Sequence, residues 1–212
     1  MNEVIFNPTK EDIEDAGRWF DFEFSYCEGA MTELFQAFPR NENVHQVYMK
    51  AVALNALYST QIPLYNPEVP SLWEVADHIV SGKIDDLLDS GSPEAVSKVA
   101  AIDVEGKHHR FNYSFATKYC SWHRPDVYPI FDSRVNEYLW HLKKLGTIPI
   151  AKRNDLWDYP EFKKIVNEFR ERFGLEGFSY KVTDKFLYRE GGKLLASASS
   201  TAQSEDQSES HA

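Results

Sequence analysis

The fold of this chain is decided by residues 114–135, which read SFATKYCSWHRPDVYPIFDSRV. Aromatic residues recur at helical spacing after Ser114, so the stretch opens as a helix with side chains directed to a core. Pro125 ends that helix, and the following residues are expected to be extended because residues before a proline avoid the α region. Asp132 then stands where the next helix begins, and an aspartate there accepts hydrogen bonds from the first-turn amides. The stretch predicts two helices joined by an extended crossing, with Asp132 as the N-cap of the second.

Helical periodicity and capping residues continue through most of the chain. The expected helices are 9–22, 28–38, 43–60, 71–82, 83–91, 92–102, 114–123, 133–146 and 159–174. The segment 179–190 is ambiguous between helix and strand, and residues 3–6 give a weak strand signal. The sequence therefore predicts a mainly α fold, with one domain over residues 1–195.

The last seventeen residues, 196–212, read ASASSTAQSEDQSESHA and offer no apolar surface to bury, so we expect them to be a disordered acidic tail. No run of about 18 apolar residues is present, which excludes a membrane-spanning helix. The acidic N-terminus lacks the apolar core of a signal peptide. We therefore expect a cytoplasmic monomer, located at the nucleoid or in the nucleus if it acts on DNA.

Charge is distributed unevenly along the chain. The net charge is −10, which argues against indiscriminate binding of polyanions. Residues 1–103 carry 6 Lys and Arg against 18 Asp and Glu, whereas residues 104–172 carry 13 against 9. One segment is therefore suited to face a phosphate backbone, although exposed helices also vary in charge without any such role.

Two parts of the central stretch resemble the signature of the helix-hairpin-helix (HhH-GPD) DNA glycosylases of base excision repair. SFA, residues 114–116, and YPIFDSRV, residues 128–135, fall into that family's frame without a gap. The segment LYSTQI, residues 57–62, is similar to the family's early helix, whose polar end approaches DNA. The resemblance implies a helical glycosylase fold, with Ser114 in the position of the nucleophilic lysine and Asp132 in that of the catalytic aspartate.

The hairpin of that family is a tight glycine-rich turn whose backbone amides bind phosphate. Here residues 103–112 are longer and keep one glycine, Gly106, so we expect an altered hairpin. Side chains of this connector are candidates to contact phosphate instead, unless they form a solvated loop tip. The predicted DNA-binding residues are Gln61, Lys107, His108, His109, Arg110 and Arg134.

The chemistry that the resemblance implies is cleavage of an N-glycosidic bond. An ionised Asp132 would stabilise the oxocarbenium charge on the sugar and orient the attacking water. Lys118 lies one helical turn after Ser114 and is a candidate nucleophile only if its surroundings lower its pKa. The simpler expectation is an ion pair with Asp132 or another carboxylate. The target base would be flipped into a pocket, for which the candidates are Tyr58, Tyr119 and Trp122, aromatic residues that are equally suited to core packing.

Cys27 and Cys120 are too few for a four-cysteine cluster, and we expect neither metal nor cofactor. The leading interpretation is a monofunctional DNA N-glycosylase that acts on a damaged or modified base, with DNA as its partner. Two alternatives remain open. One is a non-catalytic protein on the same fold that binds or senses a nucleic acid, a nucleotide or a partner. The other is a different glycosidic reaction, on a free nucleoside, a nucleotide or another small substrate, with the same carboxylate.

Overall fold

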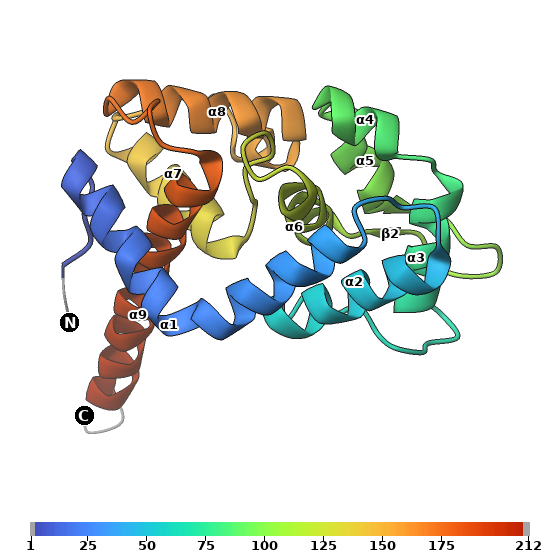
Figure 1. Ribbon diagram of the computed structural model, residues 1–212. Coiled ribbons are helices and arrows are strands. Elements are labelled where there is room, and N and C mark those ends of the chain that lie inside the picture. Colours follow the sequence, from blue (N-terminus) through green and yellow to red (C-terminus); the bar gives the residue numbers. More distant parts are fainter. Residues whose placement is uncertain (1–2, 210–212) are drawn as a thin grey trace.

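A computed structural model describes the backbone of residues 3–209 and the side chains of residues 3–198. Over this range the chain is mainly helical, as predicted (Figure 1). The elements in order are α1 (Lys10–Ala37), α2 (Val44–Tyr58), α3 (Leu72–Ser81), α4 (Asp85–Ser90), α5 (Glu94–Ala100), β1 (Ala101–Ile102), β2 (Arg110–Phe111), α6 (Tyr113–His123), α7 (Ser133–Lys144), the 3-10 helix η1 (Arg153–Trp157), α8 (Tyr159–Arg172) and α9 (Tyr180–Glu209).

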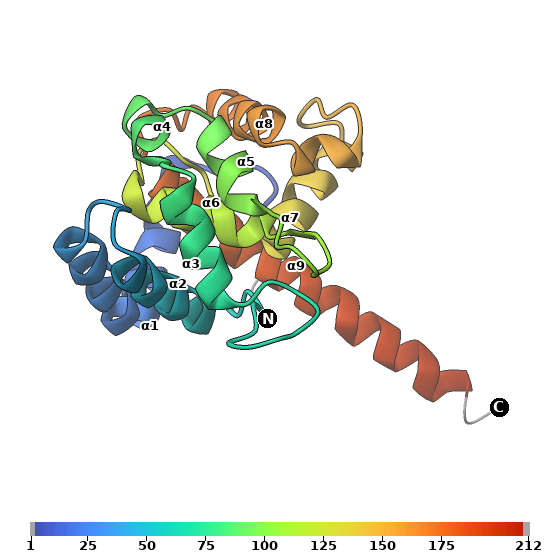
Figure 2. The ribbon, with the colours of Figure 1, turned by 90° about the vertical axis from the view of Figure 1, so that its right-hand side faces the viewer.

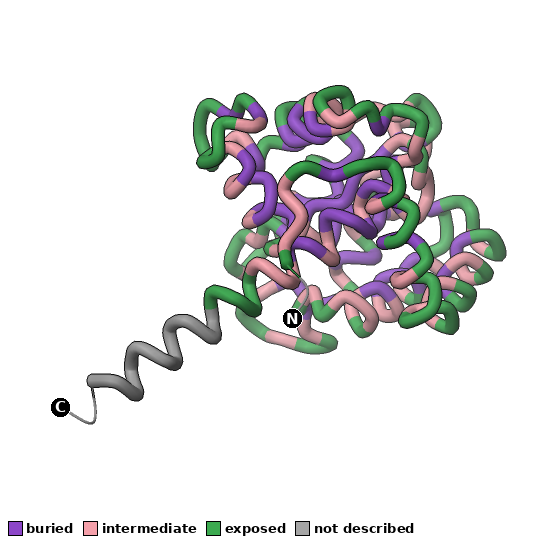
Figure 3. The backbone as a smooth tube through the Cα atoms, turned by 90° about the vertical axis from the view of Figure 1, so that its left-hand side faces the viewer, coloured by how far each residue is buried: buried purple, intermediate pink, exposed green. Residues whose placement is uncertain are grey.

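Helix α6 lies in the middle of the molecule, between α1 and α2 on one side and α8 on the other (Figures 1 and 2). Eight of the nine residues from Tyr113 to Ser121 in α6 are buried, and the exception is the half-buried Ser114. One connected cluster of buried hydrophobic side chains extends from Ile13 in α1 to Leu187 in α9, and Figure 3 shows the buried segments gathered inside the surrounding helices. The central position of α6 means that a polar side chain on it is either satisfied internally or opens into a pocket.

Capping residues fix the starts of the helices, as the sequence predicts. Thr9 and Asp12 form a reciprocal capping box at α1, and Ser71 and Glu74 form another at α3. Asn43 caps α2 with its side-chain oxygen. The two helices expected over 9–22 and 28–38 are continuous in the structure as α1, with a kink at Phe24, where the backbone leaves the helical region (φ −120°, ψ 15°).

A short antiparallel β-hairpin occupies residues 101–111, where the resemblance led us to expect an altered hairpin. Ala101 pairs with Phe111, and Ile102 pairs with Arg110. The loop between the strands includes Gly106 at φ +78°, a left-handed conformation that glycine adopts without strain. The hairpin is tied to the preceding loop because the backbone N–H of His108 donates to the carbonyl of Glu68.

The ambiguous segment 179–190 is helical, as the first part of α9. The strand predicted at residues 3–6 is wrong: these residues are held by side chains instead of a sheet partner. The N–H of Ile5 donates to the buried Glu190, and Tyr138 donates to the carbonyl of Ile5. The expectation of a disordered tail falls partly on α9, whose backbone is helical to Glu209, and partly on residues 210–212, which lie outside the described residues.

Helices long and apolar enough to cross a membrane are absent from the part of the chain that the structure describes.

Candidate functional site

The amine of Lys118 is buried in the centre of the molecule beside Ser114. Its Nζ donates to Ser114 Oγ at 2.7 Å and to the carbonyl of Phe131 at 3.3 Å. Only 3% of the side chain is exposed. Side chains on a helix point back towards its N-terminus, so a lysine four residues after Ser114 reaches the position of Ser114 itself.

Asp132 has two roles in the geometry. Its Oδ1 accepts from the backbone N–H of Val135 at 3.0 Å, which makes it the N-cap of α7 as predicted. Its Oδ2 lies 3.9 Å from Lys118 Nζ, so the expected ion pair between these residues is present. The carboxylate is 17% exposed and is therefore reachable from solvent while being held in place.

Thr117, which was not among the residues predicted for the site, fixes the segment before Asp132. Its buried hydroxyl accepts from the N–H of Phe131 at 3.1 Å and lies 3.3 Å from the carbonyl of the same residue. This contact joins α6 to the extended crossing one residue before Asp132. Thr117 is therefore a positioning residue for the carboxylate.

A pocket of about 500 Å³ opens over this cluster. It is lined by Leu57, Tyr58, Ser59, Thr60, Ser114, Lys118, Phe131, Asp132, Ser133, Arg134, Asn136, Trp157 and Tyr188. Part of the segment 57–62 thus meets Ser114 and Asp132, although these parts are far apart in the sequence. Ser59 and Gln61 adopt left-handed backbone angles (φ 50° and 58°), which non-glycine residues adopt infrequently and which often mark functional loops.

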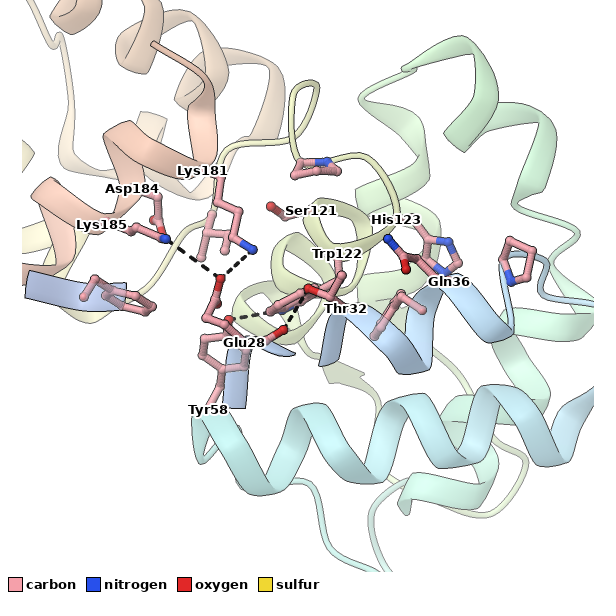
Figure 4. Close-up of a pocket in the computed structure, with 15 residues that line it drawn as sticks. Glu28, Thr32, Gln36, Tyr58, Ser121, Trp122, His123, Lys181, Asp184 and Lys185 are labelled. Atoms are coloured by element: carbon pink, nitrogen blue, oxygen red, sulfur yellow. Dashed lines mark hydrogen bonds and ion pairs between the residues drawn. The ribbon is translucent and has the colours of Figure 1, made fainter. Parts of the chain in front are cut away.

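A second pocket, of about 410 Å³, is shown in Figure 4 and shares Tyr58 with the first. Trp122 Nε1 donates to the Tyr58 hydroxyl at 3.1 Å, so two of the three predicted base-pocket residues are in contact here. Glu28 of α1 pairs with Lys181 at 2.5 Å and with Lys185 at 3.9 Å, both from α9. The pocket is therefore amphipathic, with aromatic walls and charged groups at one end.

Tyr119, the third predicted base-pocket residue, lies in the core and away from both pockets. Its side chain is fully buried, and its hydroxyl donates to Asn41 Oδ1 at 2.5 Å. It lines neither of the two pockets. The reason is helical phase: Tyr119 directly follows Lys118 and so points to a different side of α6.

Electrostatics link the two pockets through Asp184 of α9, a residue that sequence reasoning missed. Burial lowers the pKa of the Lys118 amine, and the negative charges of Asp132 and Asp184 oppose that shift. Burial and the neighbouring Asp132 raise the pKa of Asp184 well above its usual range. The ambiguity of segment 179–190 concealed this residue, since its direction follows only once α9 is known to be a helix.

The connector side chains predicted to contact DNA are mostly engaged within the protein. Lys107 pairs with Glu74 at 2.6 Å, His109 Nδ1 lies 2.7 Å from Asp103 Oδ1, and Arg110 donates to the carbonyl of Gln61 at 2.9 Å. The side chains of Gln61 and His108 are exposed.

Arg134 differs from these residues because its guanidinium stacks over the Tyr188 ring at 4.1 Å and lines the pocket of Asp132. Among the described residues, no carboxylate forms an ion pair with it. Arg134 is thus the predicted DNA-binding residue that lies closest to the candidate chemistry.

Groups of three or more His, Cys, Asp and Glu side chains placed to hold a metal ion do not occur among the described residues. Cys120 is fully buried. His123 Nε2 instead lies 3.2 Å from Nζ of Lys50, a buried lysine that also donates to the carbonyls of Phe38 and Arg40.

The fold and site define a mainly helical protein in which Ser114, Lys118 and Asp132 line one pocket. The chain belongs to the family HI_0787_N, described as an N-terminal domain, which matches residues 12–127. Ser114 and Lys118 lie inside the matched range, and Asp132 and Asp184 lie beyond it.

A protein of Haemophilus influenzae described as uncharacterized is 35% identical over 133 residues, which cover 62% of this chain and 63% of that protein. The match thus spans less than two thirds of the relative's length. No solved structure matches the chain.

Proposed function

We propose that this chain is a DNA N-glycosylase-like hydrolase on a divergent helix-hairpin-helix glycosylase fold, with Asp132 as its catalytic carboxylate. The observation that carries the proposal is the junction of Ser114, Lys118 and Asp132 in one pocket. This is the pairing of positions that the resemblance to the glycosylases predicted from two separate parts of the stretch 114–135.

In this mechanism Asp132 acts on the sugar. Leaving of the base develops positive charge at the anomeric carbon, and an ionised carboxylate beside it stabilises that charge. The same carboxylate orients a water for attack. The carboxyl group is held at the pocket by two contacts: Oδ1 accepts the cap hydrogen bond from the Val135 N–H, and Oδ2 lies 3.9 Å from Lys118 Nζ.

Lys118 and Ser114 have a structural role in the pocket. The amine, shielded from solvent, donates to Ser114 Oγ and to the carbonyl of Phe131, and so fixes the end of the crossing next to Asp132. We assign the reaction as monofunctional because this amine is engaged in three contacts and its side chain is almost wholly buried.

The test is base release from duplex oligonucleotides that carry uracil, 8-oxoguanine, alkylated or hypermodified bases. Strand cleavage after alkali reports base removal, and Asp132→Asn is the matched variant, since asparagine also caps helices well. The proposal expects cleavage of at least one substrate and its loss in Asp132→Asn. Cleavage of none of them, or equal cleavage by the variant, overturns it.

The second candidate is a non-catalytic protein that binds or senses a nucleic acid, a nucleotide or a partner. The observation that favours it is the engagement of Lys107, His109 and Arg110 with groups of the protein itself, in a chain of net charge −10. A fluorescence titration with labelled DNA at several salt concentrations separates the two, because phosphate contacts make affinity fall as salt rises. Salt-dependent binding without cleavage favours a nucleic-acid sensor, and the absence of binding at low salt favours a partner other than DNA.

A further inference from the structure

Asp184 places a carboxyl group in the second pocket without a partner. It is half-buried and lines the space between α9, Tyr58 and Trp122 (Figure 4). Among residues 3–198, no side chain forms a hydrogen bond or an ion pair with this carboxyl. The neighbouring Lys181 and Lys185 form their ion pairs with Glu28 and none with Asp184. A carboxyl group that lines a pocket and has no side-chain partner in the protein is available to form hydrogen bonds with a ligand there.

The walls of the pocket suit a flat ligand. Aromatic side chains reach it from three helices: Phe20 and Phe35 from α1, Tyr58 from α2 and Trp122 from α6. Aromatic surfaces bind planar heterocycles by stacking, while a few polar groups fix the orientation of the ring. The volume of about 410 Å³ is within the usual range for a small-molecule site.

The surroundings of Asp184 determine which hydrogen bonds it offers. Negative charge faces it from Asp132 on α7 and Glu28 on α1, and positive charge faces it from Lys118 on α6 and Lys185 on α9. Burial and the two carboxylates prevail, so its pKa is raised and the neutral acid is favoured. A neutral carboxylic acid presents one donor and one acceptor side by side, whereas a carboxylate only accepts.

We propose that Asp184 is the specificity-determining residue of this pocket and binds a planar nitrogen heterocycle through an edge that carries a donor next to an acceptor. Nucleobases present such edges, for example the amino group and ring nitrogen of adenine or the imide of uracil. This inference rests on the proposed function, for which it names the group that reads the released or flipped base.

Calorimetric titration of the full chain with free bases tests this directly. The probes are 9-methyladenine and 1-methyluracil, in which the nitrogen that bears the sugar in a nucleoside is blocked. Each is paired with a further methylated form that lacks the donor of that edge, N6,N6,9-trimethyladenine and 1,3-dimethyluracil. The protein variants are Asp184→Asn, which keeps one donor and one acceptor, and Asp184→Leu, which keeps the size and removes both. Thermal unfolding of each variant checks that α9 remains in place.

We expect 9-methyladenine or 1-methyluracil to bind the original chain and Asp184→Asn. Its affinity should fall about tenfold or more in Asp184→Leu, and so should the affinity of its further methylated form for the original chain, as for the loss of a pair of hydrogen bonds. Binding to the original chain should weaken as pH rises and Asp184 ionises, and binding to Asp184→Asn should not. Equal binding by a folded Asp184→Leu, or no binding of either base to the original chain, overturns the inference.

The two proposals fail separately. Binding that depends on Asp184, in a chain that cleaves none of the oligonucleotides, removes the glycosylase assignment and leaves the heterocycle site standing. Cleavage that depends on Asp132, with base binding unaffected by Asp184→Leu, supports the glycosylase assignment and removes the heterocycle site.

Discussion

Lys118 Nζ and Ser114 Oγ lie 2.7 Å apart because the two residues stand one helical turn apart on the same face of α6. In the sequence Lys118 stands four residues after Ser114, the residue that the resemblance to the glycosylases places in the position of the nucleophile. In the structure the long side chain returns the amine to the serine. Two functional groups therefore meet at this point, the hydroxyl of Ser114 and the amine of Lys118.

The first prediction concerns whether Lys118 forms a covalent intermediate. If the reaction is monofunctional, sodium borohydride added during base release will trap no protein–DNA adduct, since the amine is buried and engaged with Ser114, Phe131 and Asp132. Denaturing gel electrophoresis detects such an adduct by its mass. An adduct that disappears in Lys118→Arg would contradict the prediction and assign Lys118 as the nucleophile, in keeping with the lowered pKa of its amine.

The second prediction separates the two roles of Asp132. Asp132→Ser and Asp132→Ala both remove the charge, but only serine keeps a side-chain acceptor for the N–H of Val135. We expect Asp132→Ala to be less stable than Asp132→Ser by about 1 kcal/mol in urea unfolding. We expect base release to be lost equally in both.

A capping role alone gives a different pattern. Activity would then follow stability, and Asp132→Ser would retain most of it.

The helices of this chain were predictable because their start signals are local. Thr9 with Asp12 and Ser71 with Glu74 are reciprocal pairs three residues apart, and Asp132 caps α7 through a residue three positions on. Local hydrogen bonds of this kind can be recognised in a sequence without knowledge of the fold.

The second pocket was not predictable in the same way. Its charged end joins Glu28 to Lys181 across about 150 residues, and the side-chain direction of Asp184 depends on the docking of α9 against α1 and α7. The ion pair of the connector was hidden for a similar reason: Lys107 pairs with Glu74, which is 33 residues away in the sequence. Tertiary pairing of this kind leaves no periodic signal.

The third prediction compares Arg134 with Lys107 as candidate phosphate contacts. Arg134 has no ion pair with the described residues and lines the pocket of Asp132, whereas Lys107 forms an ion pair with Glu74. We expect Arg134→Ala to weaken DNA binding and to reduce the slope of log affinity against log salt by about 1. Lys107→Ala should leave that slope unchanged and instead lower stability. A reduced slope in Lys107→Ala would restore the connector as a phosphate-binding loop.

The fourth prediction concerns His123, which is partly buried beside the cation of Lys50. Burial, Lys50 and Arg40 together lower the pKa of His123 to about 3. Between that value and the pKa of about 6.5 in the unfolded chain, the unfolded state holds the extra proton, so the free energy of unfolding falls by about 1.4 kcal/mol for each unit of decreasing pH. The stability from this residue is thus complete above pH 6.5 and is lost on acidification.

Urea unfolding at pH 7, 6 and 5 checks this against His123→Gln, whose side-chain oxygen still accepts from Lys50. The difference in stability between the two proteins should shrink or reverse as pH falls, while titration of other groups, such as Asp184, is common to both. A pH-independent difference would show that His123 takes up its proton equally in the folded state.

The last prediction concerns the contact that holds α7 and the site residues at its start. Gly191 of α9 packs directly on the backbone of Arg134: a Cβ added to Gly191 would lie 2.2 Å from the Arg134 carbonyl oxygen and 2.6 Å from its carbonyl carbon. Neither atom can move without shifting α7, so Gly191→Ala should cost about 1–3 kcal/mol of stability in spite of the better helix propensity of alanine. The adjacent Gly192 is the matched control, because its added Cβ meets only the flexible end of the Arg134 side chain, at 3.3 Å. Gly192→Ala should be neutral or stabilising by up to about 1 kcal/mol. Urea unfolding of the two variants measures both values. Equal stabilities would mean that α7 and α9 are not in close backbone contact. A selective loss of base release in Gly191→Ala would show in addition that the position of α7 sets the position of Asp132.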